Sequence, residues 1–210
     1  MIEAISLSFG YRPGEAVIRT WSGSIALGEV VSLTGRSGSG KSTLLYLLGA
    51  LLRPWSGSLR IGGVEVATAG DRGRSDVRAA HVGFVFQDAL LDTRRSIMEN
   101  ILEGVVYRGG HRGEAVNEAR RLLESFAVGV EPNRRATDLS GGQAQRVALC
   151  RALIGKPIVL LADEPTGNLD RESAAGVERA LFDYSRSGAA VVVATHDEAL
   201  AARCDRRFPL

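Results

Sequence analysis

Gly35-Arg36-Ser37-Gly38-Ser39-Gly40-Lys41-Ser42 is the stretch that decides the fold of this chain. It matches the pattern G-x-x-x-x-G-K-[ST], and it lies between the apolar segment Val30–Thr34 and the leucine-rich segment Lys41–Leu51. A strand, a glycine-rich loop and a helix in this order form a P-loop, in which backbone N–H groups and a helix N-terminus face phosphate oxygens. We therefore predict a nucleotide-phosphate site made by Gly35, Arg36, Ser37, Gly38, Ser39, Gly40, Lys41, Ser42 and Thr43.

The lysine of this loop stands out in the composition. The chain has 26 lysine and arginine residues, and only Lys41 and Lys156 are lysines. A lysine kept in an arginine-rich background indicates that its compact ammonium group is needed there. In a P-loop this lysine binds the β- and γ-phosphates, and the hydroxyl that follows, here that of Ser42, binds Mg²⁺. We expect Lys156 to be an ordinary surface residue.

Two acids at the end of a hydrophobic segment form the second motif. The segment is Ile158–Ala162, and Asp163 and Glu164 follow it directly. Ligand sites of α/β proteins lie at the carboxyl ends of parallel strands, so Asp163 is placed to hold Mg²⁺. Glu164 is placed to polarise a water molecule for attack on the γ-phosphorus of ATP. Alone, two acids after a strand are a weak signal, but together with the P-loop they indicate ATP hydrolysis.

Strand-like and helix-like segments alternate along the chain, which predicts an α/β fold with a mostly parallel sheet. The pair Gly62-Gly63 lies between two short β-like segments and predicts a hairpin. The polar segment Ala69–Asp76 is expected to be a loop, and Ser96–Tyr107 is expected to be one helix. The chain is expected to be one domain, 1–210, with a core and β subdomain at 1–87 and 157–210 and a helical insertion at about 88–156.

Composition excludes several classes of protein. A chain of 210 residues is long enough for one domain with a full core. Its net charge of +2 argues against a dedicated nucleic-acid binder. Its longest apolar runs have the length of strands, and its first residues lack the pattern of a signal peptide. Two isolated cysteines, Cys150 and Cys204, fit a reducing compartment and predict no disulfide framework.

Leu139-Ser140-Gly141-Gly142-Gln143 resembles the signature motif of ATP-binding cassette (ABC) ATPases. The other motifs occur in the order of that family: the P-loop, Gln87 after a strand, the signature, Asp163-Glu164, Asp170, and His196 after a strand. The resemblance covers nearly the whole chain. It implies a P-loop NTPase with a RecA-like, mostly parallel core sheet, an antiparallel β subdomain and an inserted α-helical subdomain.

The resemblance also implies catalytic roles. Glu164 would be the catalytic base, and His196 would hydrogen-bond the γ-phosphate of ATP. Gln87 would contact Mg²⁺ and the attacking water and would sense a membrane partner. Tyr11 stands where the family stacks an aromatic ring on adenine, and a ring has a suitable face for this contact. The metal ligands implied are Ser42, Gln87 and Asp163.

In the family, the P-loop and the signature of one chain face different ways, so two chains pair head to tail around two ATP molecules. Asp170 would position groups across this dimer. The complete motif set makes a homodimer sufficient, although a heterodimer is open. The residues implied to contact ATP held by the opposite subunit are Ser140, Gly141, Gly142 and Gln143.

The motifs most resemble the ATPases of lipoprotein-releasing complexes, macrolide exporters and the cell-division ABC complex. This subgroup implies a cytoplasmic subunit that works on the cytoplasmic face of the cell membrane through a separate permease, for export or force transmission. One alternative is a cell-division ATPase that regulates cell-wall remodelling. Another is a soluble ABC ATPase of translation or DNA repair, which the single cassette and the lack of heptads argue against. A non-catalytic scaffold would lack a catalytic group, and none is missing here.

Overall fold

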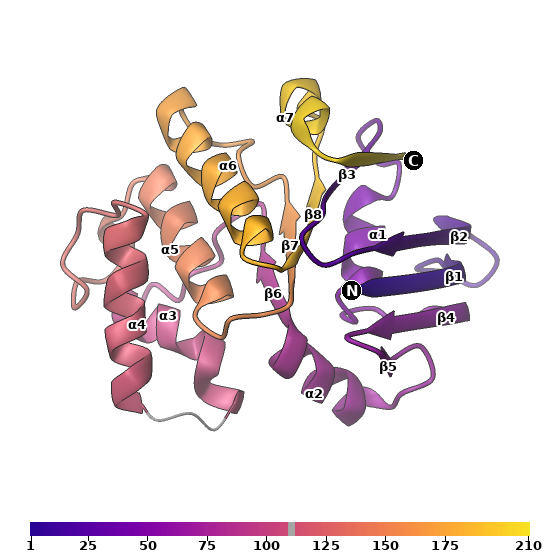
Figure 1. Cartoon of the computed structure of the whole chain (residues 1–210), viewed down its shortest axis with the longest axis horizontal. Helices are drawn as coiled ribbons and strands as arrows, with labels where there is room; N and C mark the ends of the chain where they lie inside the picture. The colour runs from indigo at the N-terminus through magenta and orange to yellow at the C-terminus, as the bar shows by residue number, and fades with distance from the viewer. Residues whose placement is uncertain (109–111) are drawn as a thin grey trace.

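A computed structural model describes residues 1–108 and 112–210, and its central element is a five-stranded sheet (Figure 1). The strand order is β6-β7-β8-β3-β9, and every neighbouring pair is parallel. The predicted parallel α/β fold is therefore confirmed. The strands are β3 (Val30–Thr34), β6 (Val82–Val85), β7 (Val159–Asp163), β8 (Ala190–Ala194) and β9 (Arg206–Pro209).

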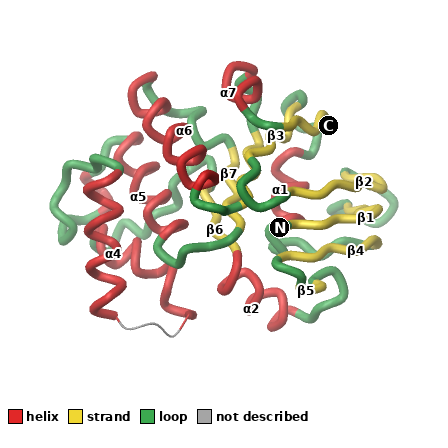
Figure 2. Tube along the Cα trace, in the orientation of Figure 1, coloured by secondary structure: helices red, strands yellow, loops and turns green. Residues whose placement is uncertain are grey.

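A second sheet is antiparallel and has the order β2-β1-β4-β5. It lies beside helix α1 on the right of Figure 1, and its strands are seen in yellow in Figure 2. The predicted hairpin at Gly62-Gly63 joins β4 and β5. The strands are β1 (Ile2–Phe9), β2 (Ile18–Ile25), β4 (Ser56–Ile61) and β5 (Val64–Glu65).

The inner strands β3, β7 and β8 of the parallel sheet are buried on both faces, as βαβ connections require. One face packs against α1 (Lys41–Leu48) and the antiparallel sheet, through residues such as Leu161 and Val192. The other face packs against α5 (Gly141–Leu153) and α6 (Arg171–Arg186), through residues such as Leu160. The helices that carry the P-loop and the signature therefore lie on opposite faces of one sheet.

A helical layer lies on the left of Figure 1 and has a core of its own. Buried side chains of α3 (Ile97–Leu102) and α4 (Arg112–Ser125) meet those of α5, such as Val147, in this core. Ser96 caps α3 with a reciprocal Ser96–Glu99 capping box. No helix within residues 1–108 or 112–210 is long and apolar enough to cross a membrane.

The prediction of a loop at Ala69–Asp76 was wrong, because α2 spans Asp71–His81. Only Val77 of this helix is buried, so its sequence lacks an apolar stripe. Polar contacts hold the helix instead. Arg74 pairs with Asp71 at 2.5 Å, and Arg78 Nη1 donates to the carbonyl oxygen of Ala50 at 2.8 Å.

Other elements also differ from the expected ones. The helix expected at Ser96–Tyr107 is α3 followed by a 3₁₀ helix, Glu103–Arg108. Strand β2, helix α7 (Glu198–Arg203) and strand β9 were not predicted. Strand β9 contains Pro209 and lies at the sheet edge beside β3, where a proline is tolerated.

Helix α5 packs unusually close to β6. A Cβ atom at Gly83 of β6 would lie 2.5 Å from the carbonyl oxygen of Ala152 of α5, so only glycine fits. Leu149 and Leu153 of α5 lie in one apolar cluster with Val85 of β6. The signature helix is thus fixed directly to a strand of the core sheet.

Candidate nucleotide site

The P-loop connects β3 to α1 at the carboxyl end of β3. Gly35, Gly38 and Gly40 have positive φ angles of 149°, 80° and 102°, which other residues rarely adopt. With these angles, the backbone of the loop can fold around a central space. The Oγ atom of Ser39 is buried and has no hydrogen-bond partner in the described residues. A buried hydroxyl without a hydrogen-bond partner, next to a helix N-terminus, fits a loop that binds an anion.

Lys41 is buried, and its ammonium group points back into the loop. Its Nζ donates to the carbonyl oxygens of Gly35 at 2.9 Å and Arg36 at 3.1 Å. These bonds use two of three N–H groups, so at least one donor is left for a phosphate oxygen. The first turn of α1 contributes no acidic residue of its own that would neutralise the positive end of the helix dipole.

Asp163 ends β7 and reaches the first turn of α1. Ser42 Oγ donates to Asp163 Oδ1 at 2.9 Å, and Tyr46 also hydrogen-bonds the carboxylate. Burial raises the pKa of Asp163, and the bonds from Ser42 and Tyr46 oppose that shift. Burial and the nearby Asp163 raise the pKa of Tyr46 to about 12. A carboxylate and a hydroxyl 2.9 Å apart beside a phosphate loop form a donor set that suits Mg²⁺.

Glu164 is held at the ends of β7 and β8 in an unusual backbone conformation. Its φ angle is 42°, in the left-handed region, and its N–H donates to the carbonyl oxygen of Ala194 at 2.9 Å. Its Oε1 lies 2.9 Å from His196 Nδ1, and its Oε2 accepts from Thr195 Oγ1 at 3.3 Å. Such local strain is common at active sites. The contacts fix the carboxylate in one orientation.

Tyr11 lies on the surface next to the P-loop helix. Its hydroxyl hydrogen-bonds Thr43 Oγ1 at 3.1 Å, and its ring meets Phe9 edge-to-face with centroids 5.1 Å apart. The residue is 63% exposed. The ring is therefore held by Phe9 and by its hydroxyl, while much of its surface is open to a planar ligand.

The signature motif forms the N-terminus of α5. Ser140 and Gln143 make a reciprocal capping box, and Gln143 Nε2 also donates to the carbonyl oxygen of Val128 at 3.3 Å. Gly141 is exposed with open space around it. A Cβ atom at Gly142 would lie 2.5 Å from Ser173 Oγ of α6. The motif therefore presents an open helix N-terminus, a shape that binds anions.

Gln87 and Asp170 flank these motifs. Gln87 follows β6 and is exposed. Asp170 caps α6 by accepting a hydrogen bond from Ser173 N at 2.9 Å, and this bond lowers the pKa of Asp170. The structure thus joins the P-loop, Asp163, Glu164 and His196 at one sheet edge. In the described residues, no hydrogen bond or ion pair joins the signature to the P-loop.

Sequence reasoning missed two residues of this site. Thr195 is buried and hydrogen-bonds Glu164, and Tyr46 hydrogen-bonds Asp163. Tyr46 follows Ser42 by four residues on α1, so helical spacing could have placed both on one face. Thr195 directly follows the buried strand β8, the same signal that pointed to His196.

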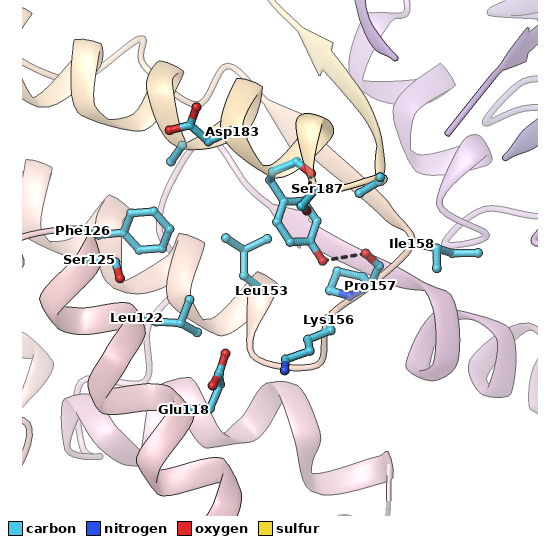
Figure 3. Close-up of a pocket in the computed structure, with 14 residues that line it drawn as sticks. Glu118, Leu122, Ser125, Phe126, Leu153, Lys156, Pro157, Ile158, Asp183 and Ser187 are labelled. Carbon is cyan, nitrogen blue, oxygen red and sulfur yellow. Dashed lines mark hydrogen bonds between the residues drawn. The ribbon is translucent and has the colours of Figure 1, made fainter. Parts of the chain in front are cut away.

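A cavity of about 620 Å³ lies elsewhere, between α4 and α6 (Figure 3). Leu122, Phe126 and Leu153 line it, and Lys156 lies at its edge. Tyr184 donates to the carbonyl oxygen of Pro157 at 2.6 Å, shown as a dashed line. Ile158 and Ala189 also line the cavity and directly precede β7 and β8, so the cavity is at the sheet edge opposite the P-loop.

Residues 18–167 match the family described as ABC transporter. The chain belongs to this family. This ABC cassette is 45% identical over 197 residues to the lipoprotein-releasing system ATP-binding protein LolD of Cereibacter sphaeroides, covering 93% of this chain and 88% of that one. It is 44% identical over 180 residues to the uncharacterised ABC transporter ATP-binding protein YbbA of Escherichia coli K12, covering 85% and 79%.

A third relative is larger. The cassette is 38% identical to the macrolide export ATP-binding/permease protein MacB of Chlorobaculum tepidum, over 98% of this chain but 32% of that protein. Among solved structures, it matches the dimeric ATP-binding cassette MJ0796 bound to ADP and Pi with a TM-score of 0.90 and 33% identity, covering 100% and 94% of the two chains. The ABC ATPase fold and the ATPase activity expected from the sequence are therefore confirmed.

Proposed function

We propose that two copies of this ABC cassette close head to tail around two ATP molecules and that the closure drives a separate membrane permease. The separation of two anion-binding features supports this proposal. The P-loop and Ser140–Gln143 belong to helices on opposite faces of the sheet, so one chain offers two half-sites. The dimeric state of the MJ0796 cassette supports the same arrangement. One chain carries both half-sites, which favours a homodimer.

Within each composite site the chain's own residues divide the work. Lys41 and the P-loop amides bind the phosphates, and Tyr11 stacks on adenine. Glu164, oriented by His196 and Thr195, accepts a proton from water as the water oxygen bonds to the γ-phosphorus and the bond to the β-phosphate oxygen breaks. The partner's signature binds the γ-phosphate.

Mg²⁺ fits this site. Asp163 and Ser42 would hold it with the phosphates of ATP, and Gln87 would complete the set on closure. In the described residues no cluster of three or more His, Cys, Asp or Glu offers a full metal cage, and Mg²⁺ in nucleotide sites needs none. The ion would neutralise charge that develops on the transferred phosphoryl group.

Mixing two inactive variants tests the composite site. Lys41→Ala removes the cis phosphate contact, and Ser140→Arg blocks the trans contact with bulk and positive charge. A mixed dimer has both lesions in one site and an intact second site. If the sites act independently, the mixture regains ATPase activity that neither variant shows. If both sites must close together, the mixture stays inactive. Full activity of Ser140→Arg alone contradicts the head-to-tail dimer.

We further propose that the cassette works on the cytoplasmic face of a membrane, bound to a permease of the export or lipoprotein-releasing kind. The names of the LolD and MacB relatives support this assignment. A groove beside Gln87, lined by Phe86, Leu90 and Arg151, offers a docking surface with an exposed Leu90.

Membrane fractionation tests this docking. Leu90→Asp should release a tagged cassette from the membranes of cells that express its permease and leave the ATPase activity of the isolated chain unchanged. Leu27→Asp, which changes another exposed leucine, is the matched control. Equal retention of Leu90→Asp and the control would contradict docking at this groove.

A further inference from the structure

Helix α5 holds the segment around Gln87 on both sides. Before Gln87, Gln145 Nε2 donates to the carbonyl oxygen of Phe86 at 2.9 Å. After it, Arg151 donates through Nη2 to the carbonyl oxygen of Ala89 at 2.7 Å and through Nη1 to that of Leu90 at 2.8 Å. The side chain of Gln87 itself is exposed, so its position depends on how its backbone is held.

A packing role alone does not explain these contacts, because burying the polar side chains of Gln145 and Arg151 costs free energy. Gln145 is 3% exposed, and burying an amide without a partner is unfavourable. Burial lowers the pKa of the Arg151 guanidinium, which Glu103 partly offsets. An apolar side chain at either position would avoid that cost. The planar guanidinium, however, can reach two carbonyl oxygens at once, and that property fixes a loop.

The same helix begins at the signature motif. Ser140 caps α5, and Gln145 and Arg151 lie 5 and 11 residues further along the one continuous helix, Gly141–Leu153. Helix α5 is packed tightly against β6 at Gly83. A force that acts on the N-terminus of α5 is therefore transmitted along the whole helix. Helix α5 therefore carries both the signature, which would contact ATP, and the side chains that hold the segment around Gln87.

We infer that Gln145 and Arg151 are positioning residues that couple the signature to Gln87, so that ATP bound at the partner's P-loop helps to set Gln87 of this chain's own site. The inference rests on the role proposed for Gln87. Arg151 donates to backbone carbonyls and is not among the residues proposed to contact ATP or the attacking water. Its loss therefore changes the rate of hydrolysis more than the binding of ATP.

The test is a double-mutant cycle between Arg151→Met and Gln87→Ala, measured as steady-state phosphate release. Arg151→Met removes both hydrogen bonds and keeps the length of the side chain. We expect kcat to fall about 10-fold, the equivalent of one charge-assisted hydrogen bond, while KM for ATP changes less than about 2-fold. In the Gln87→Ala background the same change should lower kcat less than about 2-fold, because the group that Arg151 positions is absent.

Further variants separate positioning from folding. Arg151→Lys should recover part of the lost kcat, because one ammonium group reaches fewer carbonyls than the guanidinium fork. Gln145→Met should show the same dependence on Gln87 as Arg151→Met. Arg121→Met, which removes an exposed arginine of α4 paired with Glu118, is the matched control and should leave kcat unchanged. Thermal melts confirm that each variant is folded.

Two outcomes overturn the inference and differ from each other. If Arg151→Met lowers kcat by the same factor with and without Gln87, or not at all, Arg151 does not act through Gln87. If Gln87→Ala hydrolyses ATP at the wild-type rate, the role of Gln87 itself is rejected, and the inference falls with it. The head-to-tail dimer survives either result, because the mixing of Lys41→Ala and Ser140→Arg tests it separately.

Discussion

Replacing Glu164 with glutamine should separate ATP binding from hydrolysis. The carboxylate has three contacts: His196 Nδ1 at 2.9 Å, Thr195 Oγ1 at 3.3 Å and His196 N at 3.4 Å. A glutamine oxygen can still accept from Thr195 Oγ1 and from the backbone N–H. Its NH₂ group can donate to Nδ1 of a neutral His196. We therefore expect the free energy of unfolding to change by less than about 1 kcal/mol.

The catalytic effect should be much larger, because an amide cannot accept the proton of the attacking water. The loss of a general base lowers turnover about 10²–10⁴-fold, or about 3–5.5 kcal/mol in activation free energy. With Mg-ATP, Glu164→Gln should elute from gel filtration as a dimer that contains ATP, whereas phosphate release should be almost absent. A variant that hydrolyses ATP at the wild-type rate would remove Glu164 from the role of base.

Three further predictions concern the same site. Lys41→Ala should abolish binding of a fluorescent ATP analogue, and wild-type affinity would show that the loop does not hold the phosphates. Tyr11→Ala should weaken binding of that analogue about 10-fold by removing a stacking face, whereas Tyr11→Phe should bind normally; equal affinities would exclude stacking. Asp163→Asn should stop hydrolysis and stabilise the nucleotide-free protein by about 1 kcal/mol at pH 7. Burial raises the folded pKa of Asp163, so wild-type stability falls as pH rises from the unfolded pKa to the folded pKa, and in urea melts the advantage of Asn should grow as pH rises above the unfolded pKa.

The sequence predicted best where the signal is local and strong. The P-loop and the apolar segment that ends at Asp163 and Glu164, which is strand β7, depend on residues that are neighbours in the chain. Helix α2 was not predicted, because the hydrogen-bond partner of Arg78 is Ala50, which is 28 residues away. Strand β9 was not predicted, because its two arginines and its proline become a strand only by pairing with β3.

Within the site, the identity of the residues was easier to predict than their contacts. Chain order placed Glu164 and His196 at strand ends, but the 2.9 Å approach of their side chains depends on the pairing of β7 with β8. The hydrogen bonds of Gln145 and Arg151 to the segment beside Gln87 join parts of the chain 59 to 62 residues apart. No local pattern of residues encodes such distances.

The scarcity of lysine gives this ABC cassette an unusual chemical property. Lys41 is buried and holds its own loop, whereas Lys156 is exposed at the rim of the cavity between α4 and α6. Acylating reagents that attack lysine amines should therefore react at Lys156 in preference to Lys41. A fluorophore attached to Lys156 would report on the sheet edge far from ATP, without the need to engineer a cysteine.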